Sequence, residues 1–297
     1  MQEPRLNHVT CANPKGLHRM AWWEWGAADN PRVVVCVHGL ARQGRDFDVL
    51  ARALAQDFRV VCPDVVGRGQ SDWLPDPMHY QIPSYVADMV TLIARLNVPR
   101  VAWVGTSMGG LIGMTLAALR APGQAPLIER LVVNDVGPVI EYASLQRIGQ
   151  YLGAPMRFET IEQAAAALRV ISASFGPHTP EQWLALSRPQ FKPAPEGGWM
   201  FHYDPAIAVP YRAYTPEVAQ VAEAMLWQTW DAIDCPTLLV RGADSDLLSA
   251  ATARAMGERG PKARCVEFAG VGHAPTLVAD DQVACVRQFL QDLSPRG

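Results

Sequence analysis

The stretch Arg100-Val-Ala-Trp-Val-Gly-Thr-Ser-Met-Gly-Gly-Leu-Ile-Gly-Met-Thr-Leu-Ala-Ala-Leu119 joins a strand-like apolar run to a helix-like apolar run through a glycine-rich turn. At its centre the residues follow the pattern G-x-S-x-G, which places a serine on a sharp strand-to-helix turn. Gly105 and Gly109, two residues before and after Ser107, allow strand and helix to approach closely. We predict that Ser107 is a nucleophile; the alternative is a glycine-rich turn whose serine has no function.

Further β-branched apolar runs alternate with helical patterns along the chain. The strand-like runs cover residues 31–37, 58–62, 100–104, 129–134, 237–241 and 264–268. Strands and helices in repetition predict an α/β fold with a mostly parallel sheet that has helices on both faces. We expect Arg19–Trp25 to add an antiparallel edge strand.

This alternation stops between Gly137 and Trp230, where helical stretches such as Ile161–Ile171 precede a passage rich in proline, glycine and aromatic residues. We predict that residues 137–230 form an inserted, mainly helical cap, and that residues 1–136 and 231–297 form the core domain. The aromatic residues of this segment suggest a lipophilic acyl or alcohol pocket, although aromatics at helical spacing more often pack in a core. They are Phe175, Trp183, Phe191, Trp199, Phe201, Tyr203, Tyr211, Tyr214, Trp227 and Trp230.

A serine hydroxyl is a weak nucleophile near neutral pH, so a base must take its proton. Of the seven histidines, His273 combines a position after the last predicted strand with one ahead of the final helix, in Gly270-Val-Gly-His-Ala-Pro275. We predict that His273 is this base. His38 is the main rival, but a histidine before a glycine at a strand end more often orders the neighbouring loop.

The base needs a carboxylate that fixes its tautomer and stabilises the imidazolium. The stretch Arg241-Gly-Ala-Asp-Ser-Asp-Leu-Leu248 follows a predicted strand and offers two aspartates. We predict that Asp246 is the catalytic acid, with Asp244 as the alternative.

Five motifs in this order resemble the α/β-hydrolase superfamily, in its branch of capped serine esterases, lactonases, C–C bond hydrolases and haloperoxidase-like enzymes. They are His38-Gly39-Leu40, Asp64–Asp72, Gly105–Gly110, Gly242–Leu248 and Gly270–Pro275. Some members of this fold carry the acid after the preceding strand, which adds Asp135 as a third possibility. Because Ser107 stands where dehalogenases of this fold carry an aspartate, that activity and epoxide hydrolysis are disfavoured.

The resemblance also implies an oxyanion hole, in which N–H donors stabilise the charge of the tetrahedral intermediate. Its donors would be the backbone N–H groups of Met108, after the nucleophile, and of Leu40, in the loop after His38-Gly39. The stretch Asp64–Asp72 would be a structural turn beside the site, without a chemical role. Arg42, just past the oxyanion loop, is a candidate for binding a substrate carboxylate; the competing interpretation is a solvated surface arginine.

These features predict a serine hydrolase, a carboxylesterase that cleaves esters or lactones of a lipophilic small molecule through an acyl-enzyme intermediate. The same triad serves C–C bond hydrolases of vinylogous diketones and serine acyltransferases, which remain alternatives. A non-catalytic, ligand-binding member of the fold is a further alternative.

The bulk composition narrows the possible partners and compartment. The net charge is −3 and the basic residues are scattered, which argues against a nucleic-acid partner. No apolar run approaches the ~18 residues of a membrane span, and the N-terminus lacks the apolar stretch of a secretory signal. Six cysteines without C-x-x-C spacing indicate buried thiols in a reducing compartment. Isolated histidines predict no metal, and we expect a cytoplasmic protein without a cofactor; its oligomeric state is not readable from the sequence.

Overall fold

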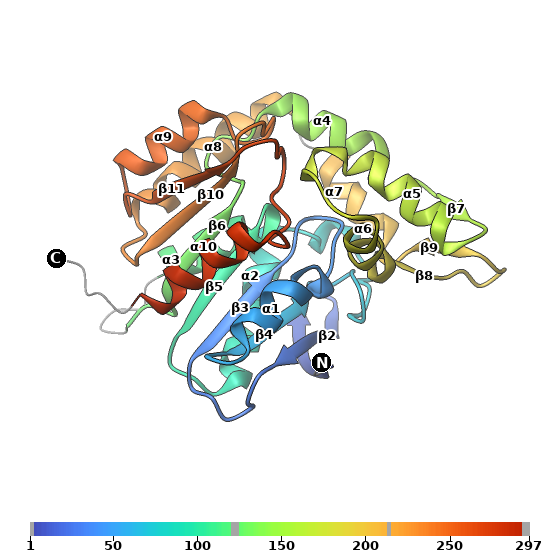
Figure 1. The fold of residues 1–297 in the computed structure, drawn as a ribbon, viewed down its shortest axis with the longest axis horizontal. Helices are drawn as coiled ribbons and strands as arrows, with labels where there is room; N and C mark the ends of the chain where they lie inside the picture. The colour runs from blue at the N-terminus through green and yellow to red at the C-terminus, as the bar shows by residue number, and fades with distance from the viewer. Residues whose placement is uncertain (1–2, 120–124, 213–214, 293–297) are drawn as a thin grey trace.

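The computed structural model describes residues 3–119, 125–212 and 215–292, and its centre is an eight-stranded sheet (Figure 1). The strands run in the order β1-β2-β4-β3-β5-β6-β10-β11, and those from β4 to β11 are parallel. Their bounds are β1 Arg5–Asn13, β2 Gly16–Trp25, β3 Val33–Val37, β4 Arg59–Asp64, β5 Val101–Thr106, β6 Ile128–Asn134, β10 Thr237–Gly242 and β11 Arg264–Phe268. The predicted mostly parallel sheet is confirmed.

The N-terminal segment forms a hairpin that the sequence predicts only in part. The strand expected at Arg19–Trp25 is present as the end of β2 and pairs antiparallel with β4, but it is not the edge of the sheet. Outside it lies β1, paired with β2 along its whole length. Within β1 only Val9 and Cys11 are buried, so this strand lacks the continuous apolar run that marks the parallel strands.

Two apolar layers cover the sheet because side chains alternate between its faces. In β3, Val33, Val35 and Val37 belong to one buried cluster, whereas Val34 and Cys36 belong to the other. Helices α2, α3 and α9 contribute to the first cluster, and α1 and α10 contribute to the second. Their bounds are α1 Asp48–Leu54, α2 Ile82–Leu96, α3 Met108–Ala118, α9 Ala250–Glu258 and α10 Asp280–Gln291.

Between β6 and β10 the chain forms helices and a small three-stranded sheet, ordered β7-β9-β8. Figure 1 shows α4 to α7 and this small sheet extending to one side of the main sheet. The bounds are α4 Tyr142–Tyr151, β7 Arg157–Phe158, α5 Ile161–Ile171, α6 Pro180–Ser187, β8 Phe191–Pro193, β9 Trp199–Phe201, α7 Ala208–Arg212 and α8 Pro216–Asp231. The structure also contains short 3-10 helices, with the bounds η1 Gly44–Phe47, η2 Pro77–His79, η3 Ala173–Phe175, η4 Arg188–Gln190 and η5 Pro205–Ile207.

Helix α8 differs from the rest of this insertion because it returns to the main sheet and packs against α3. Its Trp230 is fully buried in the same cluster as α2 and α3, and its indole N–H donates to the Arg259 carbonyl at 3.1 Å. The division into a core and a cap of residues 137–230 stays a prediction, and Tyr214 lies outside the described residues.

Among the helices in the described part of the chain, none combines the length and the apolar character that a membrane crossing needs.

Candidate active site

Ser107 occupies a sharp turn between β5 and α3. Its backbone has φ 52° and ψ −116°, a conformation that residues with a side chain rarely adopt. The two glycines around it are required by space. A Cβ on Gly105 would lie 2.2 Å from the Gly109 carbonyl oxygen, and one on Gly109 would lie 2.0 Å from that of Val37. The turn therefore presents the Ser107 hydroxyl at the carboxyl end of the sheet.

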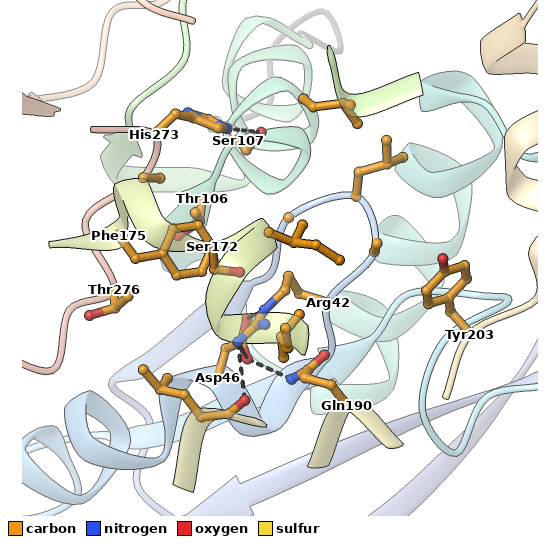
Figure 2. Close-up of a pocket in the computed structure, with 18 of the residues that line it drawn as sticks. Arg42, Asp46, Thr106, Ser107, Ser172, Phe175, Gln190, Tyr203, His273 and Thr276 are labelled. Carbon is orange, nitrogen blue, oxygen red and sulfur yellow. Dashed lines mark hydrogen bonds and ion pairs between the residues drawn. The ribbon is translucent and has the colours of Figure 1, made fainter. Parts of the chain in front are cut away.

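The loop between β11 and α10 carries His273 and brings its imidazole to the Ser107 hydroxyl. The His273 Nε2 atom lies 3.0 Å from Ser107 Oγ, and Nδ1 lies 2.8 Å from Asp135 Oδ2 (Figure 2 shows Ser107 and His273). With a proton on Nδ1, the ring donates to the carboxylate and its Nε2 can accept the serine proton. The structure thus connects serine, histidine and aspartate by hydrogen bonds.

The aspartate in this chain is Asp135, so the expectation that Asp246 contacts His273 is wrong. The Asp246 carboxylate is 48% exposed and forms an ion pair with Arg147, with Oδ2 2.7 Å from Nη2. Asp244, the alternative, is also exposed, and its backbone N–H donates to the Val271 carbonyl. The third possibility, directly after β6, is the one that reaches the imidazole.

The loop after β10 still supports the site, through a residue that the sequence analysis does not single out. The Ser245 hydroxyl donates to Asp135 Oδ2 at 2.6 Å, and the Gly242 N–H donates to Oδ1 at 2.9 Å. Asp135 is fully buried, so these two donors and His273 replace the water that the carboxylate loses. Because β6 and β10 are neighbours in the sheet, the two loops meet there.

Asn134, the residue before Asp135, links the nucleophile strand to the histidine loop. Its buried side-chain amide donates to the Thr106 hydroxyl at 3.0 Å and to the Pro275 carbonyl at 2.8 Å. One polar side chain thus contacts the residue before Ser107 and the loop that carries His273. In the sequence, Asn134 and Asp135 form a polar pair directly after the apolar run Leu131–Val133, and this pattern is the signal that could have identified Asn134.

The loop after β3 carries Leu40, one of the two expected oxyanion donors. His38 is fully buried there, and its Nε2 accepts the Val65 N–H at 3.0 Å while Nδ1 lies 2.7 Å from the Gly39 carbonyl oxygen. Burial lowers the pKa of His38 to about 3, which keeps the ring neutral. His38 therefore orders the loop and does not face Ser107.

Arg68 connects the two expected oxyanion donors, Leu40 and Met108. Its fully buried guanidinium donates to the Leu40 carbonyl at 2.8 Å and to the Tyr85 hydroxyl at 3.0 Å, and Nη2 lies 3.7 Å from the Met108 sulfur. Within the part of the chain that the structure describes, no carboxylate pairs with it. Arg68 lies in the stretch Asp64–Asp72, to which the sequence assigned only a turn.

The surrounding turn has the structural role that the resemblance implied. Asp64 is fully buried and accepts the backbone N–H groups of Gly44 and Gln70 at 2.8 and 2.9 Å. Burial raises the pKa of Asp64 to about 6, although these donors oppose the rise. The Ser71 hydroxyl donates to the Asp64 carbonyl at 2.5 Å and so closes the turn.

A pocket opens at Ser107 and His273 between the main sheet and the inserted segment. Of the aromatic residues expected there, Phe175, Phe201 and Tyr203 line it, whereas Trp183 and Phe191 are buried elsewhere in the insertion. The full wall comprises Gly39, Leu40, Ala41, Arg42, Asp46, Phe47, Thr106, Ser107, Arg147, Ile148, Tyr151, Leu168, Ile171, Ser172, Phe175, Leu186, Gln190, Phe201, Tyr203, His273, Ala274, Pro275 and Thr276.

Arg42 lies in this wall and is not a solvated surface arginine. Its side chain is 14% exposed and binds Asp46 through two hydrogen bonds, Nε to Oδ2 at 2.7 Å and Nη2 to Oδ1 at 2.8 Å. The Gln190 amide also donates to Asp46 at 2.8 Å (Figure 2). The charge of Arg42 is therefore already neutralised by a partner inside the pocket.

A second polar cluster lies away from this pocket, between the N-terminal hairpin and α2. Cys11, His18 and Asp88 are buried, with ligand atoms within 4.8 Å of one another, and His18 Nε2 lies 3.0 Å from Asp88 Oδ2. Burial, reinforced by the charge of Asp88, raises the pKa of the Cys11 thiol to about 12. His18 thus connects β2 to α2 through a buried hydrogen bond to Asp88.

The comparisons with known proteins identify one family model and several hydrolases that this chain resembles. A family model described as "Alpha/beta hydrolase family" matches residues 34–284. The 3-hydroxybutyrate-oligomer hydrolase of Cupriavidus necator is 54% identical over 290 residues, which cover 96% of this chain and 97% of that protein. Esterase YbfF of Escherichia coli is 28% identical over 272 residues, covering 89% and 94%. A solved alpha/beta hydrolase from Novosphingobium aromaticivorans matches with a TM-score of 0.84 and 37% identity, covering 98% of this chain and 99% of the other.

Proposed function

The chain belongs to the alpha/beta hydrolase family, and from this premise we propose that it is a serine hydrolase that cleaves the ester bonds of short 3-hydroxybutyrate oligomers. Its relatives support ester hydrolysis in general. The observation that carries the proposal is the hydrogen-bonded chain from Ser107 through His273 to Asp135.

In the first half of the reaction, Ser107 Oγ attacks the ester carbonyl carbon while its proton moves to His273 Nε2. Asp135 holds the Nδ1–H and stabilises the imidazolium that forms. The backbone N–H groups of Leu40 and Met108 bind the negative oxygen of the tetrahedral intermediate. The intermediate then collapses, and the leaving alcohol takes the proton from His273, which leaves an acyl group on Ser107.

In the second half, water replaces the alcohol. His273 Nε2 takes a proton from water as its oxygen attacks the acyl carbonyl, and the second tetrahedral intermediate uses the same two N–H donors. Its collapse returns the proton to Ser107 Oγ and releases a carboxylic acid. For an oligomer of 3-hydroxybutyrate, both products are hydroxy acids, each with one carboxyl end.

Arg68 has a positioning role in this scheme. Its hydrogen bond to the Leu40 carbonyl and its contact with the Met108 sulfur connect the two residues whose N–H groups bind the oxyanion. Its positive charge lies in a dry environment, where it favours the developing negative charge more than it would in water.

Ester cleavage is favoured over the alternatives that share the triad. Two of the relatives are a 3-hydroxybutyrate-oligomer hydrolase and an esterase, which favours water over another alcohol as acceptor and ester bonds over C–C bonds. The complete serine–histidine–aspartate chain argues against a non-catalytic member of the fold. We further propose that, within residues 137–230, the segment from α4 to α7 acts as the cap over this site, while α8 belongs to the core domain.

The test is hydrolysis of the 3-hydroxybutyrate dimer and of 4-nitrophenyl butyrate by the purified protein and by Ser107→Ala. We expect the wild type to cleave both and Ser107→Ala to lower kcat by at least about 10⁴-fold, because the nucleophile is gone. A fluorophosphonate probe should label the wild type once, on Ser107. Circular dichroism of the variant controls for folding, and turnover that persists in a folded Ser107→Ala would contradict the proposal.

A further inference from the structure

The pocket wall carries an unequal set of charges. Apart from His273, the wall residues with charged side chains are Arg42, Asp46 and Arg147. Arg42 and Asp46 neutralise each other through two hydrogen bonds, and their side chains are only 14% and 17% exposed. The guanidinium of Arg147 therefore remains as the positive charge that no carboxylate of the wall balances.

The partner of Arg147 lies outside the pocket wall. Arg147, on α4, pairs with Asp246 in the loop after β10, with Nε 3.0 Å from Oδ2 and Nη2 3.0 Å from Oδ1. The two side chains are 39% and 48% exposed. Water screens such a pair, and exposed pairs typically contribute only about 0–1 kcal/mol to stability. The guanidinium can therefore exchange Asp246 for another carboxylate at little cost.

Helix α4 does not depend on this ion pair for its position. The buried Ser144 hydroxyl donates to the backbone carbonyl of Asp246 at 2.5 Å, and the Tyr211 hydroxyl donates to the Leu145 carbonyl at 2.6 Å. Ile148 packs against the apolar cluster to which α2, α3 and α9 contribute. Arg147 is thus a movable side chain on a helix that other contacts hold in place.

The pocket wall around Arg147 suits a short aliphatic chain that ends in a carboxylate. Apolar side chains of α4 and α5, Ile148, Leu168 and Ile171, line the same pocket. An ion pair that forms beside them is less screened than one in open water. An arginine presents a planar fork of N–H donors that matches a carboxylate in two-point contact.

From these observations we propose that Arg147 binds a carboxylate of the substrate, so that the pocket selects esters that carry a negative charge near the bond cleaved at Ser107. This inference rests on the proposed function, since an oligomer of 3-hydroxybutyrate ends in such a carboxylate. The ligand class is an anionic hydroxy-acid ester. During binding, the substrate carboxylate replaces Asp246 on the guanidinium.

The experiment compares two substrates that differ in one charge: the 3-hydroxybutyrate dimer as its free acid and as its methyl ester, with cleavage of the internal ester measured. We expect the wild type to have a higher kcat/KM for the free acid. Arg147→Ala should lower the ratio of kcat/KM, acid over methyl ester, by about 10- to 100-fold, because a charge-assisted contact is lost. Arg147→Lys should fall between them, and Asp246→Asn should raise the ratio by removing the competing carboxylate.

Arg157→Ala is the matched control. Arg157 forms a comparable exposed pair with Glu196 in the same inserted segment, at 2.7 Å, and it is not part of the pocket wall. The acid-to-ester ratio of this variant should equal that of the wild type. An Arg147→Ala protein that folds and keeps the wild-type ratio overturns the proposal, as does a wild type that shows no preference for the acid.

A second substrate pair separates this proposal from the proposed function. It consists of 4-(butanoyloxy)benzoic acid and its methyl ester, in which the carboxylate lies in the alcohol part of the cleaved ester, as it does in the 3-hydroxybutyrate dimer. If the protein cleaves neither dimer but shows an Arg147-dependent preference for the free benzoic acid over its methyl ester, charge selection stands and the oligomer substrate is wrong. If no ester is cleaved in a Ser107-dependent manner, the proposed function itself fails, and charge selection fails with it.

Discussion

Asp135 occupies the position immediately after β6, with its backbone in the left-handed region at φ 56°. This turn directs the carboxylate toward His273 rather than along the strand. The Ser245 hydroxyl and the Gly242 N–H hold the carboxylate from the side of β10. An aspartate in this place keeps the imidazole in the tautomer whose Nε2 can accept the Ser107 proton.

We expect Asp135→Asn to lower kcat for a neutral ester by about 10⁴-fold, because the amide would favour the wrong tautomer of His273. Steady-state kinetics on 4-nitrophenyl butyrate, together with a melting curve for each variant, measures this effect.

Asp246→Asn and Asp244→Asn are the matched comparisons, since they change the two aspartates that the sequence favoured. Both should lower kcat far less than Asp135→Asn does, because neither carboxylate contacts His273. If Asp246→Asn were as damaging as Asp135→Asn, the assignment of the acid from this geometry would be wrong.

At the scale of elements, β5 and α3 meet at a turn that only glycine can satisfy at two positions. A Cβ on Gly105 would collide with the backbone of Gly109 and Gly110, and backbone atoms cannot rotate away as a side chain can. Trp103 tightens the same junction, because its indole N–H donates to the Gly109 carbonyl at 3.0 Å. The position of Ser107 therefore depends on close packing of the strand against the helix.

We predict that Gly105→Ala lowers the free energy of unfolding by at least about 1–3 kcal/mol, the usual cost of forcing an extra group into a packed core. The variant should also lose esterase activity, because the turn that carries Ser107 must shift. Urea denaturation followed by circular dichroism gives the stability change.

Gly257→Ala is the control for this substitution. Gly257 lies in α9, where an added Cβ meets only the Ala263 carbonyl at an ordinary 3.4 Å. This variant should be unchanged or more stable by up to about 1 kcal/mol, since alanine favours a helix more than glycine does. If both substitutions changed the free energy of unfolding by the same amount, the backbone collision at Gly105 would be relieved without a loss of stability.

At the scale of the whole molecule, the inserted segment leaves the main sheet after β6 and returns before β10. Its final helix, α8, packs on α3, the helix that begins at the nucleophile. Trp230 is fully buried in the apolar cluster to which α2 and α3 contribute, whereas Met225 on the same helix is 62% exposed. Helix α8 therefore contributes to the core even though it lies inside residues 137–230.

We expect Trp230→Ala to lower the free energy of unfolding by about 3–5 kcal/mol, as for other buried large aromatics. Met225→Ala, on the exposed face of α8, should change it by no more than about 0.5 kcal/mol. Urea unfolding monitored by circular dichroism compares the two variants. A Trp230→Ala protein as stable as the wild type would show that α8 is not part of the core.

Local patterns in the chain are sufficient for the parallel strands, for the turn at Ser107 and for the loop that holds His273. Each of these features is encoded by neighbouring residues: a β-branched run, a glycine two positions away, or a glycine-rich loop before a helix. The structure places the His273 Nε2 atom 3.0 Å from the Ser107 Oγ atom. The two residues can meet because the turn and the loop lie at the same end of the parallel strands. Strand β1 was not predicted from such a pattern, because only one of its faces is buried and its sequence lacks a continuous apolar run.

The choice among the aspartates was decided by tertiary structure. Because β6 and β10 are adjacent and parallel, the loops after both strands open at the same edge, and an acid on either could reach one histidine. Backbone direction after β6 brings Asp135 to the ring, while Asp246 turns outward to Arg147. The pairing of Arg42 with Asp46 and the contacts of Arg68 are settled in the same way, by which side chains the folded chain brings within hydrogen-bond distance.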